Sequence, residues 1–286
     1  MKKTRFCLIY LLSVLFTTGC GRSDNSGSKE ILVVSIEPLR NITEQIVGDE
    51  YQVETILDKG ANPETFDPSM SRMASVDKSK AFFSTGAFPF EDKLAEVSNK
   101  NVQIVDVTRG IKRVYGTHTH NNGEECHHEA DPHTWTSAKN TKAIAGNIVE
   151  ALAKINPDRE TAYRHRLDSL NTVIDSLDQR IEDRLENVKT RSFAIWHPSL
   201  SYLARDYNLN QVAVGQENKE ISPRRMKEII KKATDEGIKV FFFQREFDSN
   251  QAITINESLG TKMITIDPLA YDWMEQLEII SDALSE

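Results

Sequence analysis

Residues 156–190 read NPDRETAYRHRLDSLNTVIDSLDQRIEDRLENVKT, the longest helical pattern in the chain. Beyond Pro157, apolar side chains recur every three or four residues, with no glycine or proline between them. They are Tyr163, Leu167, Leu170, Ile174, Leu177, Ile181, Leu185 and Val188. At a rise of 1.5 Å per residue, this pattern predicts one helix roughly 45–50 Å long, which is enough to span two domains.

Short β-branched or aromatic runs alternate with helical patterns on both sides of this helix. The first set of candidate strands is 31–35, 53–57, 81–84 and 102–107, and the second is 192–196, 211–214, 239–243 and 262–266. Nearly continuous apolar runs are typical of parallel strands that are covered on both faces. We therefore predict an α/β fold in which two βα-repeat lobes, each with a parallel four-stranded sheet, are joined by the long helix.

A coiled-coil arm or one side of a helical bundle has the same periodicity as the long helix. Its position between two matching βα sets favours a rigid strut that packs on both lobes. The predicted organisation is a signal peptide at 1–19, a lipidated tether at 20–29, an N-terminal lobe at 30–155 with a His-rich loop at 117–129, a linking helix at 156–190 and a C-terminal lobe at 191–286.

The first twenty residues, MKKTRFCLIYLLSVLFTTGC, begin with three basic side chains and continue with an apolar run that is too short to span a bilayer. They predict a secretory signal peptide. The cut site resembles a lipobox in which Cys20 is acylated, although Thr17 stands where leucine is usual; a plain signal peptide is the alternative. The polar residues that follow Cys20 are typical of a flexible tether.

Charge and cysteine content narrow the function classes. Loss of the signal peptide changes the formal net charge from −8 to −11, which disfavours nucleic acid and suits cations. If Cys7 is removed and Cys20 carries lipid, Cys126 is the one remaining cysteine. No disulfide can then form within one mature chain.

Three candidate metal ligands fall near predicted strand ends. His133 lies in DPHTW, just before a helix that we expect to begin near Ser137, and His197 directly follows the strand at 192–196. Asp267 follows the last strand. A lone histidine is more often structural than a ligand. In open parallel sheets, however, ligands bind beyond the carboxyl ends of strands, so two histidines and an aspartate at such positions indicate a metal site.

Residues 116–135, GTHTHNNGEECHHEADPHTW, contain five of the seven histidines. Besides His133, the five are His118, His120, His127 and His128, on a segment without an apolar anchor. Neutral imidazoles there can bind zinc, but ordering the segment costs entropy. We expect weaker, secondary metal binding by these four. The seventh histidine, His165, is expected on the solvated surface of the long helix.

Four stretches in order resemble the solute-binding lipoproteins that deliver zinc or manganese to ABC importers. They are PLRNITEQIVGDEYQVETILDKGANPETFDPS (38–69), DPHTWTSAKNTKAIAGNIVEAL (131–152), WHPSLSYLARDYNL (196–209) and TIDPLA (265–270). The resemblance implies two lobes joined by one long helix with metal in the cleft between them. It also implies His133, His197 and Asp267 as ligands, and an ABC permease with its cytoplasmic ATPase as partner.

The chain departs from this family at the first ligand. The family usually has glycine-alanine-x-proline-histidine, whereas residues 60–64 read GANPE, so that Glu64 aligns with the missing histidine. A carboxylate is an acceptable oxygen ligand and keeps a four-ligand set of Glu64, His133, His197 and Asp267. The alternative is an exposed Glu64, with water or a loop histidine in the fourth position.

Two imidazoles and two carboxylates suit Zn²⁺, but Mn²⁺ accepts such a set as well. His197 stands where zinc-type members of the family keep a histidine and manganese-type members an acid. The loop THTHNNGEECHH resembles the His- and acid-rich insertion of zinc-type members. Both features favour zinc.

The resulting hypothesis is a non-enzymatic, monomeric receptor, lipid-anchored on the periplasmic or cell-surface side of a bacterial membrane, that captures Zn²⁺ for an ABC permease. A manganese receptor of the same fold is one alternative. A secreted zinc hydrolase with Glu64 as general base is another, because catalytic zinc keeps a position open for water, but the sequence has no HExxH motif. An adhesin or a zinc store is the third, since some family members are adhesins.

Overall fold

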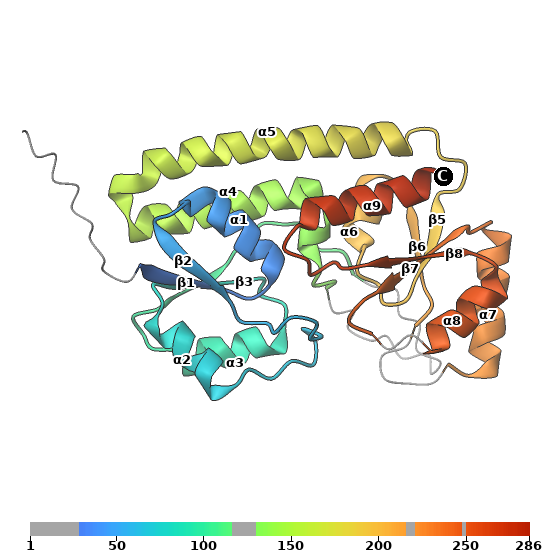
Figure 1. Ribbon diagram of the computed structural model, residues 1–286, viewed down its shortest axis with the longest axis horizontal. Coiled ribbons are helices and arrows are strands. Elements are labelled where there is room, and N and C mark those ends of the chain that lie inside the picture. The colour runs from blue at the N-terminus through green and yellow to red at the C-terminus, as the bar shows by residue number, and fades with distance from the viewer. Residues whose placement is uncertain (1–28, 116–129, 216–220, 248–249) are drawn as a thin grey trace, which may run out of the picture.

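The computed structural model of the chain describes residues 29–115, 130–215, 221–247 and 250–286. Figure 1 shows two βα lobes side by side, with one long helix lying across both. The predicted signal peptide, Cys20, the rest of the tether up to residue 28, and the loop histidines His118, His120, His127 and His128 lie outside the described residues. None of the described helices is both long and apolar enough to cross a bilayer.

The N-terminal lobe is built on a four-stranded parallel sheet in the order β2-β1-β3-β4. Its strands are β1 (Glu30–Val34), β2 (Tyr51–Thr55), β3 (Ala81–Ser84) and β4 (Gln103–Asp106). Its helices are α1 (Glu37–Val47), α2 (Met70–Lys78), α3 (Pro89–Val97) and α4 (Ala138–Ile155). Helices α1 and α4 lie on the side of the sheet that faces the long helix, and α2 and α3 lie on the other side (Figure 1).

The C-terminal lobe repeats this arrangement with the order β6-β5-β7-β8, again all parallel. Its strands are β5 (Ser192–Ile195), β6 (Asn210–Ala213), β7 (Val240–Gln244) and β8 (Lys262–Ile266). Its helices are α6 (Ser201–Asp206), α7 (Pro223–Asp235), α8 (Asn250–Leu259) and α9 (Trp273–Ser285). The predicted two-lobe α/β fold is confirmed.

The strand predictions hold to within two residues, but the edge strand β4 is mostly exposed. Central strands β3 and β7 are buried along their whole length. Strand β4 pairs with β3 alone and leaves Ile104 39% exposed. An edge strand lacks a neighbour on one side, so its side chains are more open to solvent than those of a central strand.

The linking helix is α5 (Glu160–Leu185), which follows a 3₁₀ turn at Pro157–Arg159. Its 26 residues make it about 39 Å long, shorter than the predicted helix. Its buried face packs against α1 and α4 in one lobe and α9 in the other, so the prediction of a strut on both lobes is confirmed. The buried residues are Tyr163, Leu170, Ile174, Leu177, Ile181 and Leu185.

Polar contacts fix both ends of α5. In the N-terminal lobe, Glu50 accepts hydrogen bonds from Arg159 Nε (2.9 Å), Arg166 Nη1 (2.8 Å) and the Tyr163 hydroxyl (3.0 Å). The hydrogen bond from Arg159 is the largest cause that holds the pKa of Glu50 down, at about 2. In the other lobe, Glu278 of α9 pairs with two arginines of α5. The strut therefore holds each lobe through buried apolar contacts and ion pairs.

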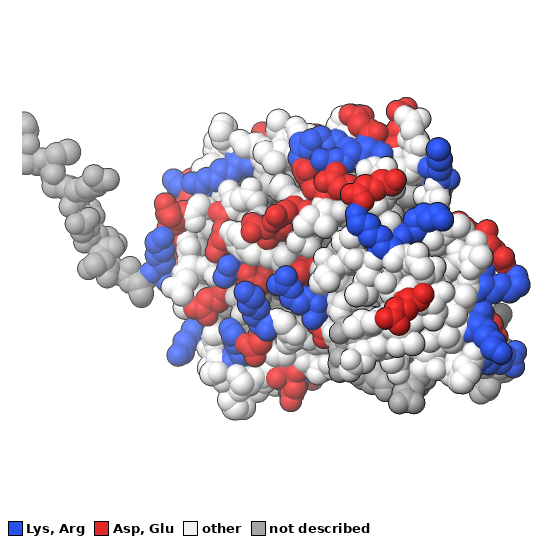
Figure 2. All heavy atoms as spheres, turned by 45° about the vertical axis from the view of Figure 1, so that its right-hand side comes forward, with Lys and Arg blue, Asp and Glu red and all other residues white. Residues whose placement is uncertain are grey.

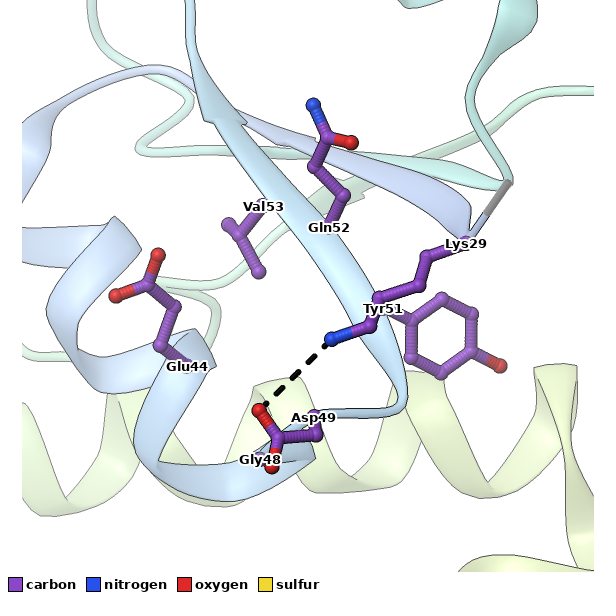
Figure 3. Close-up of a pocket in the computed structure, with 7 residues that line it drawn as sticks. All are labelled: Lys29, Glu44, Gly48, Asp49, Tyr51, Gln52 and Val53. Carbon is purple, nitrogen blue, oxygen red and sulfur yellow. Dashed lines mark ion pairs between the residues drawn. The ribbon is translucent and has the colours of Figure 1, made fainter. Parts of the chain in front are cut away.

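On the face drawn in Figure 2, acidic and basic side chains are interspersed over the described residues, and no continuous basic stripe is seen there. A hollow of about 510 Å³ lies between the end of α1 and strand β2, where Lys29 and Asp49 are 3.8 Å apart (Figure 3). None of the four predicted metal ligands lines it. The candidate site is elsewhere, between the lobes.

Candidate metal centre

Three of the four predicted ligands come together. Within the described residues, one ligand atom from each of Glu64, His133 and His197 lies within 4.8 Å of the other two. His197 Nε2 is 3.2 Å from Glu64 Oε1, and the two imidazole centroids are 5.2 Å apart. Glu64 and His133 belong to the N-terminal lobe and His197 to the C-terminal lobe. The cluster therefore lies between the lobes.

The spacing of these atoms suits a metal ion. Metal–ligand distances of about 2.0–2.2 Å place tetrahedral ligand atoms roughly 3.4 Å from one another. The Glu64–His197 pair, at 3.2 Å, already has this separation. The ligand atom of His133 lies within 4.8 Å of those of Glu64 and His197. A small adjustment of its side chain would bring it to the tetrahedral separation from both.

Asp131 orients His133. Its Oδ1 accepts a hydrogen bond from the His133 backbone N–H (2.8 Å) and lies 2.9 Å from His133 Nδ1. Both side chains are buried. Burial raises the pKa of Asp131, but the hydrogen bond and charge of His133, with smaller hydrogen-bond contributions, outweigh it and leave the pKa below its usual value. A charged carboxylate holds the proton on Nδ1, so Nε2 is left to bind a metal.

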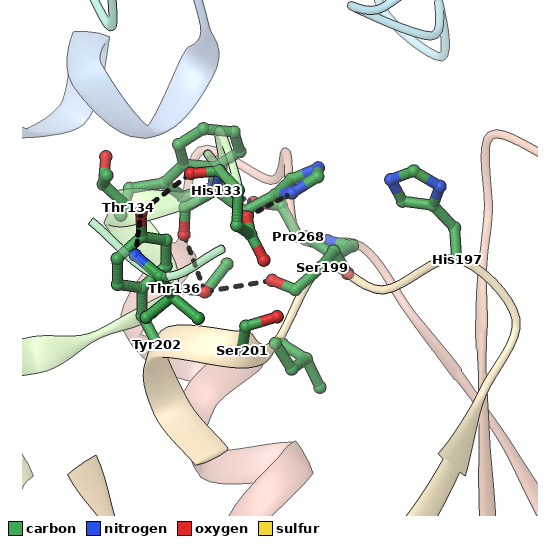
Figure 4. A network of polar contacts seen from close by, with 12 residues as sticks. His133, Thr134, Thr136, His197, Ser199, Ser201, Tyr202 and Pro268 are labelled. Carbon is green, nitrogen blue, oxygen red and sulfur yellow. Dashed lines mark hydrogen bonds and ion pairs between the residues drawn. The ribbon is translucent and has the colours of Figure 1, made fainter. Parts of the chain in front are cut away.

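The segment after His133 joins the two lobes, as Figure 4 shows. Residues Thr134–Thr136 form a 3₁₀ turn. The Trp135 indole N–H donates to the carbonyl of Pro268 at 2.7 Å, and the Thr136 hydroxyl lies 3.0 Å from the carbonyl of Ser199. Ser137 then caps α4 by accepting from the Asn140 N–H at 3.0 Å. The expectation of a helix beginning near Ser137 is confirmed.

His197 is held by the end of the neighbouring strand. Its backbone N–H donates to Gln244 Oε1 at 3.2 Å, and its carbonyl accepts from Gln244 Nε2. Gln244 is the last residue of β7 and is fully buried. The ring of Phe247 stacks on the His197 imidazole with centroids 5.3 Å apart and planes at 28°. These contacts leave the imidazole little rotational freedom.

Glu64 is positioned by a turn rather than by a helix or strand. The side chain of Asn62 accepts a hydrogen bond from the Glu64 N–H at 2.9 Å, an Asx turn. Pro63, between them, is buried. The Glu64 side chain is 21% exposed, so the structure places it in the cluster and not on the open surface.

Asp267 is not part of the three-residue cluster. It follows β8, its Oδ1 accepts from the Leu269 N–H at 3.2 Å, and its Oδ2 is 3.8 Å from Arg245 Nη1. Its role as a ligand stays a prediction.

The sequence reasoning missed Glu246, two residues beyond β7. Burial, with smaller contributions from the negative charges of Asp267 and Glu64, raises the pKa of Glu246 to about 7, against the opposing effects of a backbone hydrogen bond and of His197. Its position just after a predicted strand, like those of His197 and Asp267, was the signal that could have found it.

The two ends of the His-rich loop adjoin the site. Tyr115 and Ala130 form an antiparallel bridge, and the Asp131 N–H donates to the Val114 carbonyl at 2.8 Å. The loop therefore leaves and re-enters the fold beside the residue that orients His133. His165 is exposed on α5, as expected.

Comparison with known proteins places the chain. Residues 32–284 match the sequence profile of the family described as the zinc-uptake complex component A, periplasmic (ZnuA). The zinc-binding lipoprotein AdcA of Streptococcus pneumoniae is 26% identical over 279 residues, covering 94% of this chain and 56% of AdcA. The chain thus spans about half the length of the AdcA relatives that it matches. A Chlamydia trachomatis protein named for metal binding is 26% identical over 283 residues, covering 97% of this chain and 99% of that protein.

Solved structures show the same architecture. A crystal structure of ZnuA is 27% identical with a TM-score of 0.82, covering 90% of this chain and 98% of that chain. A zinc-bound ZnuA deletion mutant gives 27% identity and a TM-score of 0.81, covering 90% and 97%. A manganese-bound periplasmic metal-binding protein of Candidatus Liberibacter asiaticus, at 19% identity and a TM-score of 0.79 over 90% and 98%, shows the fold alone. With its two lobes, its strut and a profile match over most of its length, the chain belongs to the family of periplasmic zinc-uptake component A.

Proposed function

We propose that this protein is an extracytoplasmic receptor that binds Zn²⁺ between its lobes and delivers it to an ABC permease with its cytoplasmic ATPase. The observation that carries the proposal is the approach of Glu64, His133 and His197 to within 4.8 Å, with ligands from both lobes. The family match and the names of the zinc-binding relatives support it.

The chemistry of the cluster fits capture of a cation. Two imidazoles and a carboxylate are suitable donors for zinc, and Asp131 keeps the metal-binding nitrogen of His133 available. We assign Asp267 as the fourth ligand. The Asp267 carboxylate is 3.8 Å from the guanidinium of Arg245, which is largely exposed. To bind the metal, the carboxylate would give up this ion pair. Such an exposed ion pair costs little to break.

Manganese is the second candidate cargo, because carboxylates are also manganese ligands. The two imidazoles of the three-residue cluster favour zinc over manganese. The manganese-bound neighbour and a laminin-binding adhesin of Streptococcus agalactiae, at 22% identity, share the fold but assign no ligand here. A hydrolytic role for Glu64 is disfavoured because its carboxylate already lies at ligand spacing from His197.

The cellular setting is part of the proposal. A signal peptide at 1–19 and a lipid on Cys20 would hold the two lobes outside a bacterial membrane as a monomer. The family's periplasmic description and the lipoprotein name of the pneumococcal relative support this setting.

Calorimetry with Zn²⁺ and Mn²⁺ tests the proposal. We expect one tight zinc site in the full chain and at least tenfold weaker binding in His197→Ala. The matched control is His165→Ala, which removes an exposed imidazole from α5 and should bind like the wild type. Equal zinc affinity in wild type and His197→Ala would place the site elsewhere. Loss of zinc uptake in cells that lack the protein would connect binding to import.

A further inference from the structure

The two histidines of the candidate metal centre belong to segments that bond to each other across the lobes. Tyr202, on α6, follows His197 by five residues, and Asp131 precedes His133 by two. The Tyr202 hydroxyl donates to the carbonyl of Asp131 at 2.7 Å. Its side chain is fully buried, and α6 packs against the turn that begins after His133 (Figure 4). A side chain of the C-terminal lobe therefore reaches the residue that orients a predicted ligand of the N-terminal lobe.

The same hydroxyl closes a ring of backbone hydrogen bonds. It accepts the Val114 N–H at 3.4 Å, and the Asp131 N–H donates to the Val114 carbonyl at 2.8 Å. The oxygen of Tyr202 therefore contacts both backbone segments that meet at the bridge between Tyr115 and Ala130. Because Asp131 is held at its N–H and at its carbonyl, its backbone has little freedom to shift relative to α6.

Arg205 holds the ring of Tyr202 in place. Its guanidinium lies 5.1 Å from the centre of that ring. It also donates to the Lys112 carbonyl and to Asn140 Oδ1, each at 3.1 Å. Both acceptors belong to the N-terminal lobe, so the aromatic ring is fixed where the two lobes meet.

The segment from His197 to Tyr202 is itself tightly held. The His197 carbonyl accepts the Ser199 N–H at 2.8 Å. Gln244 hydrogen-bonds the backbone of His197 and donates to the Ser199 hydroxyl at 2.8 Å. A shift of α6 would therefore carry His197 with it. Both ends of the hydrogen bond between Tyr202 and Asp131 thus lead to a histidine of the cluster.

We propose that Tyr202 is a positioning residue of the metal centre. Its hydroxyl fixes the backbone of Asp131, whose carboxylate orients His133, and so sets the spacing between the imidazoles of His133 and His197. The inference rests on the proposed function, because it concerns the same cation site. Ligands of a metal site must be held within about 0.5 Å of their binding geometry. Loss of this one hydroxyl should therefore change both the affinity and the geometry of metal binding.

Tyr202→Phe tests the proposal, because it removes the hydroxyl and keeps the aromatic ring. In full chains, zinc affinity is measured by competition with a chromophoric chelator, and ligand geometry by the visible absorption of bound Co²⁺. We expect about three- to tenfold weaker zinc binding and a changed Co²⁺ spectrum, a smaller effect than loss of the Asp131 carboxylate because it is transmitted through that residue.

The matched control is Tyr207→Phe. It removes another buried hydroxyl just after α6, one that donates to Asp178 of the long helix and not to the segment before His133. This change should lower the unfolding temperature but leave zinc affinity and the Co²⁺ spectrum as in the wild type. Both variants are measured well below their unfolding temperatures.

A double-mutant cycle with Asp131→Asn tests the route of the effect. If Tyr202 acts through the Asp131 carboxylate, Tyr202→Phe should weaken zinc binding by less than about twofold in the Asp131→Asn background, because coupled residues are not additive. A full effect in that background would overturn the proposed route.

Two further outcomes overturn the proposal. One is wild-type affinity and spectrum in Tyr202→Phe, and the other is an equal change in Tyr207→Phe, which would mean that general loosening of the fold is responsible. His197→Ala in the same assay separates the two hypotheses. Loss of tight binding in His197→Ala with wild-type behaviour of Tyr202→Phe removes this inference alone, whereas unchanged binding in His197→Ala removes the proposed function itself.

Discussion

Asp131 accepts both the backbone N–H and, at 2.9 Å, the ring Nδ1–H of His133, so one carboxylate sets the orientation and the tautomer of a predicted metal ligand. The Tyr202 hydroxyl donates to the Asp131 carbonyl at 2.7 Å and ties this pair to α6 of the other lobe. This arrangement leaves Nε2 of His133 as the ring nitrogen that would bind a metal. Such outer partners of ligating histidines contribute to metal affinity and to ring orientation.

Asp131→Asn should weaken zinc binding by about 10–100-fold, the usual effect of losing a carboxylate partner of a ligating histidine. The amide of asparagine can donate to Nδ1, which favours the tautomer with its proton on Nε2, the atom needed by the metal. Chelator competition measures the affinity, and ¹⁵N chemical shifts of the imidazole report the tautomer. Asp168→Asn, an exposed change on α5, is the control; an Asp131→Asn variant with wild-type affinity and tautomer would contradict the assigned role.

Glu64→His should preserve or strengthen zinc binding and reduce manganese binding, because imidazole is the softer donor. Glu64→Ala should weaken both metals, since a carboxylate at ligand distance from His197 is lost. Calorimetric titration of each variant with each metal gives the comparison. Zinc affinity that survives in Glu64→Ala would show that this carboxylate is a bystander and that water or another residue completes the site.

The strands were predictable because buried parallel strands have continuous apolar runs, and such runs do not depend on the order of the strands in the sheet. The C-terminal end of α5 was not predictable. Val188 continues the apolar spacing three residues after Leu185 and packs on the core, but it is not helical. His133 was found because it follows a proline and precedes a predicted helix, and His197 because it directly follows a predicted strand. Glu246 also follows a predicted strand, as Asp267 does, but its burial depends on residues far away in the sequence and could not be predicted.

The role of Asp131 shows the same limit. The motif DPH contains the aspartate and the histidine, but only the folded turn shows that one carboxylate oxygen contacts both the backbone nitrogen and the ring Nδ1 of His133. Strand order is a similar case. Both sheets place their first strand between the second and third, and no local pattern in the sequence specifies that neighbour relationship.

Replacing residues 117–129 by two glycines should lower the zinc stoichiometry and spare the tight site. The shortened loop can close because Tyr115 and Ala130, on either side of it, are bridge partners. The tight site should be spared because His133 is held separately by Asp131. The weaker binding that disappears should also be lost from the intact chain in mild acid, because ligating imidazoles must be neutral. Metal analysis after gel filtration and calorimetry give the counts. Disappearance of the tight site on deletion would show that a loop histidine belongs to it.

Glu50 should make the attachment of α5 sensitive to acid. Hydrogen bonds from Arg159, Arg166 and Tyr163 lower its pKa from 4.5 to about 2 against the opposing effect of burial, with the Arg159 bond the largest contribution. Because the folded-state pKa is the lower one, the stabilisation is complete above about pH 4.5 and is lost as the pH falls towards 2. Glu50→Gln should therefore lower the unfolding temperature at pH 7, by roughly 2–4 °C. The difference from wild type should shrink as the pH falls below 4.

The control is Asp49→Asn, whose exposed carboxylate is 3.8 Å from Lys29. It should change neither the unfolding temperature nor its dependence on pH, since exposed pairs contribute little. Calorimetric scans from pH 7 to pH 3 measure both variants, and a Glu50→Gln difference that does not depend on pH would contradict the assigned ionisation.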